Sequence, residues 1–552
     1  MPAELERIVS KALRRTPESR YQSIRDLLLD LQNLKQQLEF EAKLERSTSS
    51  NERRSFSSKD AAVSIDRNKL RIVALLGVLV IAAVGAYFYF SRPVKSNISS
   101  IAVMPFVNQS GNSDVDYLSD GMTEALINSL SNLPNLSVKA RNTVFRYKDA
   151  NVDEKKIAQE LSVQALVLGR FTQRGDNVTL HIALVDPESG TTIWGDQYDR
   201  QLKDLAQLQK DITRDVSQKL RARLSAAEAK QLTRNYTENS EAYQLYLQGR
   251  FFWNKRSSEA TRKSIEYFEE AIAKDPGFAL AYSGLADAYV VPANRLEPNV
   301  SMPKAKTAAL QALAIDETLA EAHTSLARVL QVYEWKWADA EKEFKRALEL
   351  NPRYAVAHQW YGGYLERSGN FDQAIAERKL ALELDPLSTI TVFELGQCFL
   401  FAREYDQAIA QLQKALEMDP GFPAAHQYLP LAYIQKGMRR EALEKVRQAP
   451  ASAQIDRTGI PGYVYAILGQ TADARKELDK LKELRKSEYI SAYQLAYVCA
   501  ELGDKDEAFF WLQKSLEERG FQMQLLKVDP RLDKLRDDPR LQEFVKKVGL
   551  PD

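Results

Sequence analysis

Histidine and cysteine are the first residues to consider for chemistry, and their spacing in this chain is poorly suited to it. The 552 residues include four histidines and two cysteines. His323, His358 and His426 begin equivalent helices of a repeat, so neighbouring ones lie roughly 10 Å apart, too far to share a metal ion. Cys398 and Cys499 stand in separate apolar helical segments, which indicates buried free thiols rather than a disulfide or a reactive site. We predict no metal site, no cofactor and no catalytic residue.

Carboxylates and glycines in the first half of the chain give two weaker signals. Asp114, Asp116 and Asp120 gather at the start of an expected helix, where acidic side chains usually cap the helix and complement its dipole. A cation site is the alternative. Gly169 and Gly175 stand outside the strand–GxxxxGK–helix setting of a phosphate loop, so they indicate turn and strand packing.

The composition describes a globular, multidomain protein. Lysine and arginine number 76 against 75 acidic residues, and the net charge of +1 provides no general field for nucleic acid. With 44% hydrophobic and 27% charged residues, the balance is that of folded protein. At this length we expect several domains.

The stretch Ile72 to Phe90, IVALLGVLVIAAVGAYFYF, has no charged residue. As a helix it would span roughly 28 Å, close to the hydrocarbon thickness of a bilayer. We therefore predict a single transmembrane helix over 72–90. Basic residues are concentrated before it, which predicts a cytoplasmic N-terminus, a place in the cytoplasmic membrane and extracytoplasmic (periplasmic) C-terminal domains.

Residues 1–46 read as short amphipathic helices, and residues 47–71 as a disordered juxtamembrane linker. The phrase from Pro17 to Ser23, with Leu5 to Val9 and Lys11 to Leu13, resembles the last helices of bacterial serine/threonine protein kinases. The resemblance implies that Arg20 pairs with the glutamate of an A-P-E motif. This chain lacks that motif, and it also lacks the glycine-rich loop, the H-R-D motif and the D-F-G motif of a kinase. We expect a kinase remnant without activity. An unrelated helical hairpin, or a longer product beginning upstream of Met1, are the alternatives.

Residues 98–222 alternate between short apolar strands and amphipathic helices, which predicts an α/β domain. The sequence RGDN at 174–177 indicates a hairpin turn. The phrases IAVMPF, YLSDGMTEALINSLSN, ALVLGRF and TTIWGDQYD resemble the TolB N-terminal-like domain. The residues of this segment contain no catalytic constellation.

After residue 238 the chain repeats itself. Pro352, Pro386 and Pro420 are 34 residues apart, and alanines recur at the same interval. This period with small residues at fixed offsets is typical of tetratricopeptide (TPR) repeats. We predict about eight helical hairpins over 238–520 and a capping tail over 521–552.

Stacked TPR hairpins form a superhelix whose concave side is built from first helices, and such a groove usually takes a peptide or a helix of another protein. Six residues are predicted to line it: Gln359, Glu366, Phe393, Gln397, Gln427 and Leu431.

The predicted fold class is multidomain: a short helical cytoplasmic segment, one transmembrane helix, an α/β TolB-like domain and an all-α TPR superhelix. The predicted function is a membrane-anchored interaction and signalling module that binds a protein or peptide, with a homodimer as one possible assembly. Two alternatives stand beside it: the sensing half of a receptor kinase whose catalytic domain is truncated, and an envelope scaffold or assembly factor.

Overall fold

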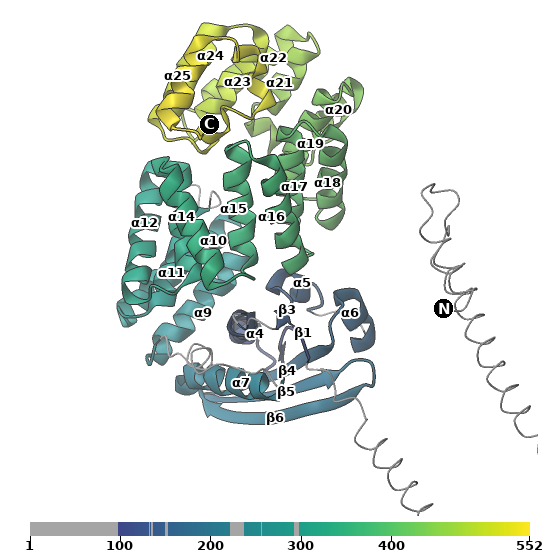
Figure 1. Cartoon of the computed structure of the whole chain (residues 1–552), viewed down its shortest axis with the longest axis vertical. Helices are drawn as coiled ribbons and strands as arrows, with labels where there is room; N and C mark the ends of the chain where they lie inside the picture. The colour runs from purple at the N-terminus through teal and green to yellow at the C-terminus, as the bar shows by residue number, and fades with distance from the viewer. Residues whose placement is uncertain are drawn as a thin grey trace, which may run out of the picture. The chain divides into compact units, whose positions relative to one another are not determined.

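The computed structural model describes residues 98–551 apart from 132, 134–135, 149–152, 221–236, 256 and 292–296. The described residues belong to one compact unit, Ser96–Asp552 (Figure 1). The predicted kinase-like helices, linker and membrane helix all fall within 1–90 and lie outside the described residues.

Within the described part of the chain, no helix is both long and apolar enough to cross a bilayer. Even the longest described helix, α12 (Pro298–Ile315), carries Lys304 and Lys306. We therefore correct the predicted fold class: the structure shows a small mixed-sheet domain followed by a predominantly helical array. The predicted single-pass localisation, the transmembrane helix at 72–90 and the membrane as a partner find no support here and are set aside.

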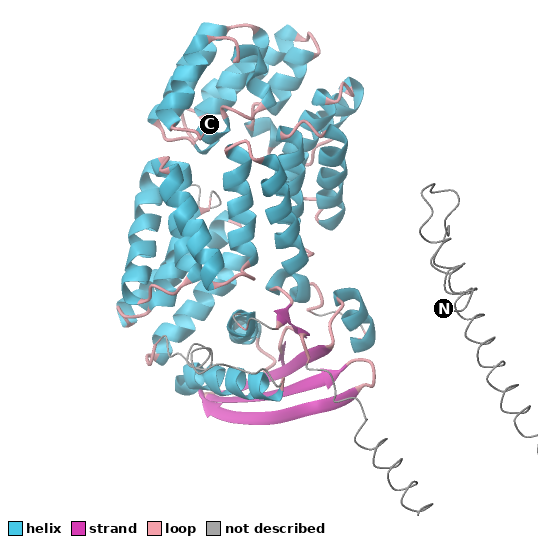
Figure 2. Cartoon of the chain, viewed as in Figure 1, coloured by secondary structure: helices cyan, strands magenta, loops and turns pink. Residues whose placement is uncertain are grey.

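The sheet domain combines parallel and antiparallel pairing (Figure 2). Strand β1 pairs in parallel with β3 and β4, whereas β4, β5 and β6 form an antiparallel meander. The sheet order is β3 (Ser137–Val138), β1 (Ser100–Val103), β4 (Ala165–Arg174), β5 (Asn177–Asp186) and β6 (Thr191–Gln201), with β2 (Val107–Asn108) beside β4. The predicted turn joins β4 to β5, and Gly175 adopts the positive φ of +59° that this tight turn requires.

Helices α4 and α7 of this domain contact each other and bury the apolar faces that the sequence pattern predicted. The helices are α4 (Asp116–Ser131), α5 (Arg141–Phe145), α6 (Glu154–Leu161) and α7 (Leu205–Lys219). Only the short α5 was not expected. Gly169 has a packing role, because a Cβ there would lie 2.3 Å from the Phe106 ring.

The described helices from α9 to α24 pair into antiparallel hairpins, each a first and a second helix of one repeat. In chain order the pairs are α9 (Ser240–Asn254) and α10 (Ser258–Lys274), α11 (Ala279–Val290) and α12, α13 (Ala320–Val329) and α14 (Trp337–Leu350), α15 (Ala355–Arg367) and α16 (Phe371–Leu384), α17 (Thr389–Phe401) and α18 (Tyr405–Met418), α19 (Pro423–Gln435) and α20 (Arg439–Arg447), α21 (Ile460–Ile467) and α22 (Thr471–Leu484), and α23 (Ala492–Leu502) and α24 (Lys505–Glu517).

The 34-residue period has a simple physical origin. Ala347, Ala381 and Ala415 are fully or almost fully buried where neighbouring helices approach closely. Four residues later the backbone N–H of an Asn or Asp bonds each alanine carbonyl and ends the helix, and the proline that follows prevents its continuation.

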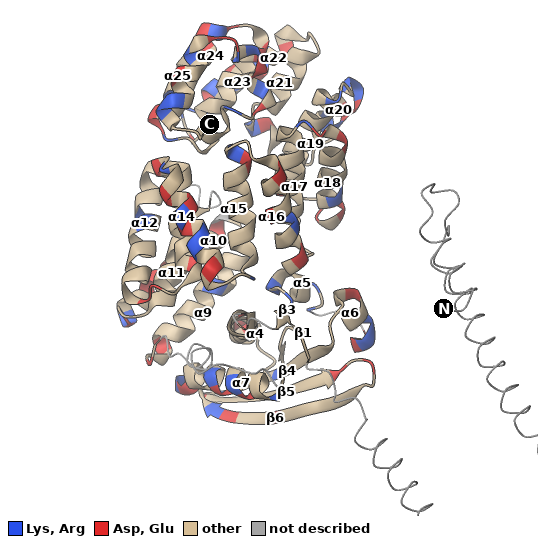
Figure 3. Cartoon of the chain, viewed as in Figure 1, with Lys and Arg blue, Asp and Glu red and all other residues tan. Residues whose placement is uncertain are grey.

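Positive and negative side chains are intermixed over the hairpins (Figure 3). Consecutive hairpins are joined by exposed ion pairs, among them Lys436 with Asp406 and Arg475 with Asp504. Each such pair contributes about 0–1 kcal/mol, so buried apolar packing carries most of the stacking energy.

A tail follows the last hairpin. It consists of the short helical turns η8 (Phe521–Leu525) and η9 (Pro530–Leu535) and the helix α25 (Pro539–Val548). Met523, Leu526, Leu532 and Leu535 are fully buried, so the tail is packed into the array along its length.

Candidate functional site

The sheet domain meets the array where α4 crosses α9. Gly121 permits the close approach, because a Cβ at this position would lie 2.9 Å from the Leu247 side chain. One turn further along α4, Glu124 faces the array and is 5% exposed. The contact therefore places a buried carboxylate between the two parts of the unit.

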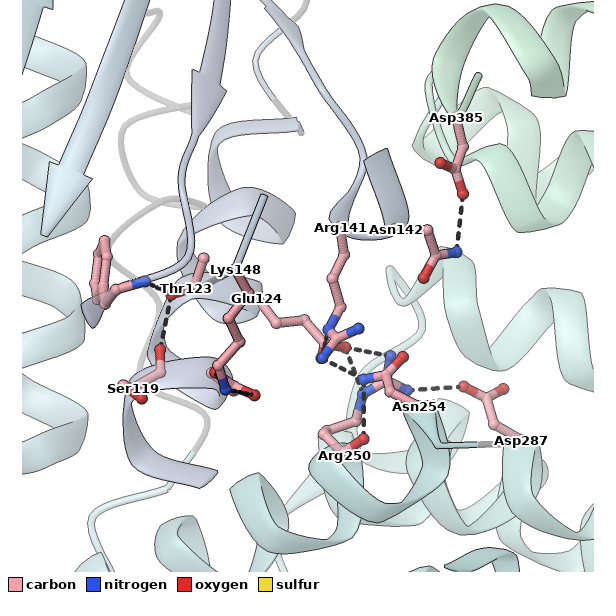
Figure 4. Close-up of polar contacts among 12 residues, drawn as sticks. Ser119, Thr123, Glu124, Arg141, Asn142, Lys148, Arg250, Asn254, Asp287 and Asp385 are labelled. Carbon is pink, nitrogen blue, oxygen red and sulfur yellow. Dashed lines mark hydrogen bonds and ion pairs between the residues drawn. The ribbon is translucent and has the colours of Figure 1, made fainter. Parts of the chain in front are cut away.

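Glu124 is surrounded by donors (Figure 4). Arg250 donates from Nε and Nη2 to Glu124 Oε1 at 2.8 and 2.5 Å, and Asn254 Nδ2 donates to Oε2 at 2.6 Å. Arg141 Nε lies 3.2 Å from the same Oε2. Although burial opposes ionisation, the two arginines hold the pKa of Glu124 below its usual range. Arg250 also reaches Asp287 Oδ2 at 3.3 Å, so the network continues into α11.

A second set of contacts joins the sheet domain to later hairpins. Asn142 and Thr143 on α5 donate to the two oxygens of Asp385, at 2.9 and 2.8 Å, just beyond α16. Arg353, before α15, donates to Ser137 Oγ at 2.7 Å. The sheet domain thus contacts the array at three separate places.

Between these contacts lies a cavity of about 220 Å³. Its walls come from α4, α5 and α7 on one side and from the first helices α9, α11, α13 and α15 on the other. Charged, hydroxyl and aromatic side chains all contribute to its lining. A concave site with a few convergent polar groups at a domain junction is a typical setting for a small ligand.

The second candidate surface is the face built by first helices, which the tail contacts. Arg531 of the tail stacks over Tyr497 of α23 at 4.5 Å from the ring centre, and Tyr493 donates to Asp529 at 2.9 Å. Further back in the array, Gln331 Nε2 donates to Gln524 Oε1 at 2.9 Å, both residues being fully or almost fully buried.

The tail also reaches the third hairpin and the turn after α17. Trp337 Nε1 donates to the carbonyl oxygen of Val548 at 3.0 Å, across 211 residues of sequence. Arg403 binds Asp533 with both terminal nitrogens, at 2.7 and 2.8 Å. The tail is therefore held by several hairpins rather than by the last one alone.

The six predicted groove residues lie within this packed region. Five of them are buried, each less than a tenth exposed: Gln359, Glu366, Phe393, Gln397 and Leu431. The sixth, Gln427, is partly buried and donates to the Ala453 carbonyl at 3.2 Å. In this state of the chain they contact the array itself, and their role in binding stays a prediction.

Glu366 is the most deeply placed of the six. It is 0% exposed and pairs with Arg378, which is 1% exposed, and with Arg367 at 3.4 Å. A third guanidinium, that of Arg328, converges on the same point, since a Cβ at Gly363 would lie 2.8, 3.6 and 3.8 Å from nitrogens of Arg367, Arg378 and Arg328. Burial and the neighbouring Arg367 lower the pKa of Arg328 to about 9. Glu366 is thus a buried carboxylate paired with Arg378 and Arg367, whereas Glu394 and Glu366 both offset the charge of Arg328.

The three repeat histidines perform a common structural task. In His323, His358 and His426, Nε2 lies 3.0, 2.9 and 2.8 Å from the carbonyl oxygen six residues earlier, which ties the first helix to the preceding turn. In the first two, Nδ1 also contacts a glutamate of the second helix, at 2.5 and 2.6 Å. Their recurrence is explained by the repeat.

His323 gives a prediction for pH dependence. Burial opposes its charge, but the hydrogen bond to Glu343 prevails and raises the pKa of His323. A raised folded-state pKa contributes stability that is fully present below the unfolded value of about 6.5 and is lost as pH rises through the folded value. The destabilisation caused by His323→Gln should therefore shrink between pH 5 and pH 8 in urea unfolding. His426→Gln is the control, because His426 has no carboxylate contact within the described residues; an equal pH trend in both variants would refute the assignment.

The other early candidates have ordinary roles. Asp120 pairs with Lys148 at 2.7 Å, and Asp116 accepts from Asn108 at 2.7 Å. Cys398 and Cys499 are buried free thiols, and burial raises the pKa of each to about 12. The sequence analysis did not predict the contacts of Glu124 at the junction of the sheet domain and the array. The reason is that Glu124 and Arg250 are more than 120 residues apart in the chain.

Family models match two kinds of segment. Residues 96–215 match the second domain of HilA/YgeH-like transcriptional regulators. Tetratricopeptide models match residues 329–389, 391–422 and 490–520. The chain thus contains TPR repeats, as predicted. The resemblance to the TolB N-terminal-like domain is corrected to the HilA/YgeH-like one. The quoted phrases fall on β1, α4, β4 and β6, which form the framework of the sheet domain. The kinase resemblance finds no support in these matches.

One curated relative is a putative adenylate cyclase 3 from Rhizobium meliloti, 33% identical over 190 residues. The match covers 34% of this chain and 32% of that protein, so the chain spans about a third of its relative's length. Among solved structures, a human IFIT1 dimer with m7Gppp-AAAA has a TM-score of 0.41 at 18% identity, covering 57% of this chain and 78% of that one. PilF of Pseudomonas aeruginosa has a TM-score of 0.31 at 21% identity, covering 42% and 97%.

Proposed function

We propose that this chain is a non-catalytic, protein-binding module whose TPR array holds a peptide segment on the face of its first helices. TPR repeats support protein–protein interaction, since stacked hairpins present an extended binding surface. In the described state the chain's own tail, residues 521–551, occupies this face as an intramolecular ligand. A partner segment binds by taking its place.

The observation that carries this proposal is Arg403. Four other hairpins place a glycine with positive φ at the equivalent turn position: Gly369, Gly437, Gly469 and Gly503. Arg403 adopts φ +66° there, which for a residue with a Cβ costs on the order of 1–3 kcal/mol. Its guanidinium binds Asp533 of the tail through two parallel hydrogen bonds, a specific geometry for a carboxylate. A strained residue at the point of contact supports a binding role for this surface.

The test lets the whole chain fold first and cuts the tail from the array afterwards. A protease site inserted between Gly520 and Phe521 allows the folded protein to be cut, and a fluorescent synthetic peptide of residues 521–551 is then added. We expect the labelled peptide to exchange with the bound tail and to bind saturably, while a scrambled peptide does not bind. A cut protein that neither releases its tail nor takes up the peptide would overturn the proposal.

Arg403→Gly supplies a sharper prediction from the same contact. The substitution removes the ion pair with Asp533 but also relieves the strained turn, so stability should be unchanged or slightly raised. Peptide affinity should fall by up to about fivefold, because the pair is half-exposed and contributes at most about 1 kcal/mol. A peptide with Asp533→Ala should bind the glycine variant and the parent equally weakly. If neither Arg403→Gly in the protein nor Asp533→Ala in the peptide changed the affinity, the role of Arg403 would be contradicted.

The cyclase relative defines a direct check of the non-catalytic assignment. We expect no cyclic AMP when the full chain is incubated with ATP and Mg²⁺. Cyclic AMP formation above the background of a heat-treated sample would show that the chain is an enzyme.

A further inference from the structure

The cavity at the junction contains polar atoms that the described residues leave unsatisfied. Ser283 Oγ on α11 and Gln209 Oε1 on α7 both line it, and neither has a hydrogen-bond partner there. The two residues are only 3% and 8% exposed. Leaving a buried polar atom without a partner costs roughly 1–3 kcal/mol. Two such atoms on opposite walls of one cavity indicate a polar occupant.

The same cavity offers an incompletely used cation. Arg141 Nε lies 3.2 Å from Glu124 Oε2, but this nitrogen is buried and has no hydrogen-bond partner among the described residues. Its guanidinium packs 3.7 Å from the centre of the Phe145 ring, which fixes its orientation. Two parallel N–H groups on a fixed guanidinium fit a carboxylate.

It also offers a carboxyl group of its own. Glu321, in the first turn of α13, lines the cavity. Glu321 forms no ion pair within the described part of the chain, and burial, reinforced by Asp287, raises the pKa of Glu321. A positively charged group placed beside Glu321 would compensate its charge.

Three other charged groups of the lining are already engaged, whereas Lys210 of α7 also lines the cavity and adds a positive charge. Arg250 binds Glu124 and Asp287, Asp385 accepts from α5, and Arg353 donates to Ser137. What remains is two cationic groups, Arg141 and Lys210, and one acidic group, Glu321, on the walls of the same cavity. A ligand of large net charge of either sign would be repelled by one kind of group, whereas a zwitterion satisfies both kinds.

The volume of the cavity and its aromatic side chains limit the class of ligand further. A volume of about 220 Å³ is below the roughly 300–1,000 Å³ of pockets for drug-sized ligands. Tyr243, Tyr246 and Trp253 supply an aromatic wall for an apolar group.

We propose that this cavity binds a small zwitterion of the α-amino acid class. The carboxylate lies on the terminal nitrogens of Arg141. The ammonium faces Glu321 and donates to Ser283 Oγ and Gln209 Oε1. The side chain packs against the aromatic wall. Because helices of the sheet domain and of four hairpins all line the site, the ligand stabilises their junction and raises the unfolding temperature by mass action.

The first experiment is a thermal-shift and calorimetry screen of the full chain with each of the twenty L-amino acids at millimolar concentration. For every amino acid that binds, two analogues are tested: the amine without the carboxylate and the acid without the amine. We expect at least one L-amino acid to bind saturably and both analogues to bind at least tenfold more weakly. No binding by any amino acid would overturn the proposal, and so would an acid analogue that binds as tightly as its parent.

Three variants test the assigned contacts. Arg141→Gln should weaken binding at least tenfold, Glu321→Gln and Ser283→Ala several-fold. Ser283→Ala removes only an unpartnered hydroxyl, so it should fold normally even if Arg141→Gln does not. Arg346→Gln, which alters an exposed pair with Glu349 away from the cavity, is the matched control. Unchanged affinity in both Ser283→Ala and Glu321→Gln would contradict the site. The tail-exchange assay does not involve this cavity, so either proposal can fail while the other stands.

Discussion

Replacing Glu366 by glutamine is expected to lower the free energy of unfolding by about 3–5 kcal/mol, the range for breaking a buried ion pair. Glu366 is fully buried, and Arg378, Arg367 and Arg328 converge beside it. Without the carboxylate, Arg378 and Arg367 would lose the buried counter-ion with which they pair, with little water to screen their charges. The loss therefore exceeds that of a single hydrogen bond.

Urea unfolding followed by circular dichroism measures this effect. Glu349→Gln is the matched control, because Glu349 forms an exposed pair with Arg346 and should change stability by less than about 1 kcal/mol. The double variant Glu366→Leu with Arg378→Leu should cost less than Glu366→Gln alone, since it removes both members of the pair. A Glu366→Gln protein as stable as the parent would show that the arginines are neutralised in another way.

The second large effect is expected at Glu124. Glu124→Gln removes the negative charge that Arg250 and Arg141 share, and we expect a loss of about 3 kcal/mol, at the lower end of the range for buried pairs because both arginines are partly exposed. Because this network joins α4 to α9, the substitution should weaken the contact between the sheet domain and the array. The sheet domain and the array should then unfold in two resolved steps.

Intrinsic fluorescence and far-ultraviolet circular dichroism, recorded over the same urea series, would separate these steps. Of the six tryptophans of the chain, Trp194 reports on the sheet domain, and Trp253 and Trp360 report on the array. Glu160→Gln, which alters an exposed contact with Tyr147 within the sheet domain, is the control. Coincident transitions in Glu124→Gln, as steep as in the parent, would mean that other contacts hold the junction.

Sequence patterns predicted what depends on neighbours in the chain. Alternation located the strands and helices of the sheet domain, and the 34-residue period located the hairpins, because each element's burial is set within one or two turns. Arg403 carried a readable signal too, since it and Trp335 stand where the other aligned turns of the period have a glycine of positive φ. The pairing of Glu124 with Arg250 had no such signal, since it depends on how two distant parts of the chain pack.

The predicted groove illustrates the same limit of local patterns. Repeat phasing placed Gln359 and Glu366 on first helices, where the structure has them. Repeat phasing could not show that the curvature of the array brings the tail back to the third hairpin, where Trp337 contacts Val548. That closure arises from small rotations summed over many repeats. Burial of the groove is therefore a property of the whole array.

The seating of the tail on the array is tested most directly by a distance measurement on the intact chain. Cysteines introduced at the exposed positions Lys336 and Lys547 can carry spin labels while the native thiols stay buried. We predict one narrow distribution at short separation, because Trp337 and Val548 are in hydrogen-bond contact. Excess peptide of residues 521–551 should broaden it towards longer distances. A broad distribution at long separation in the intact chain, without peptide, would contradict the account.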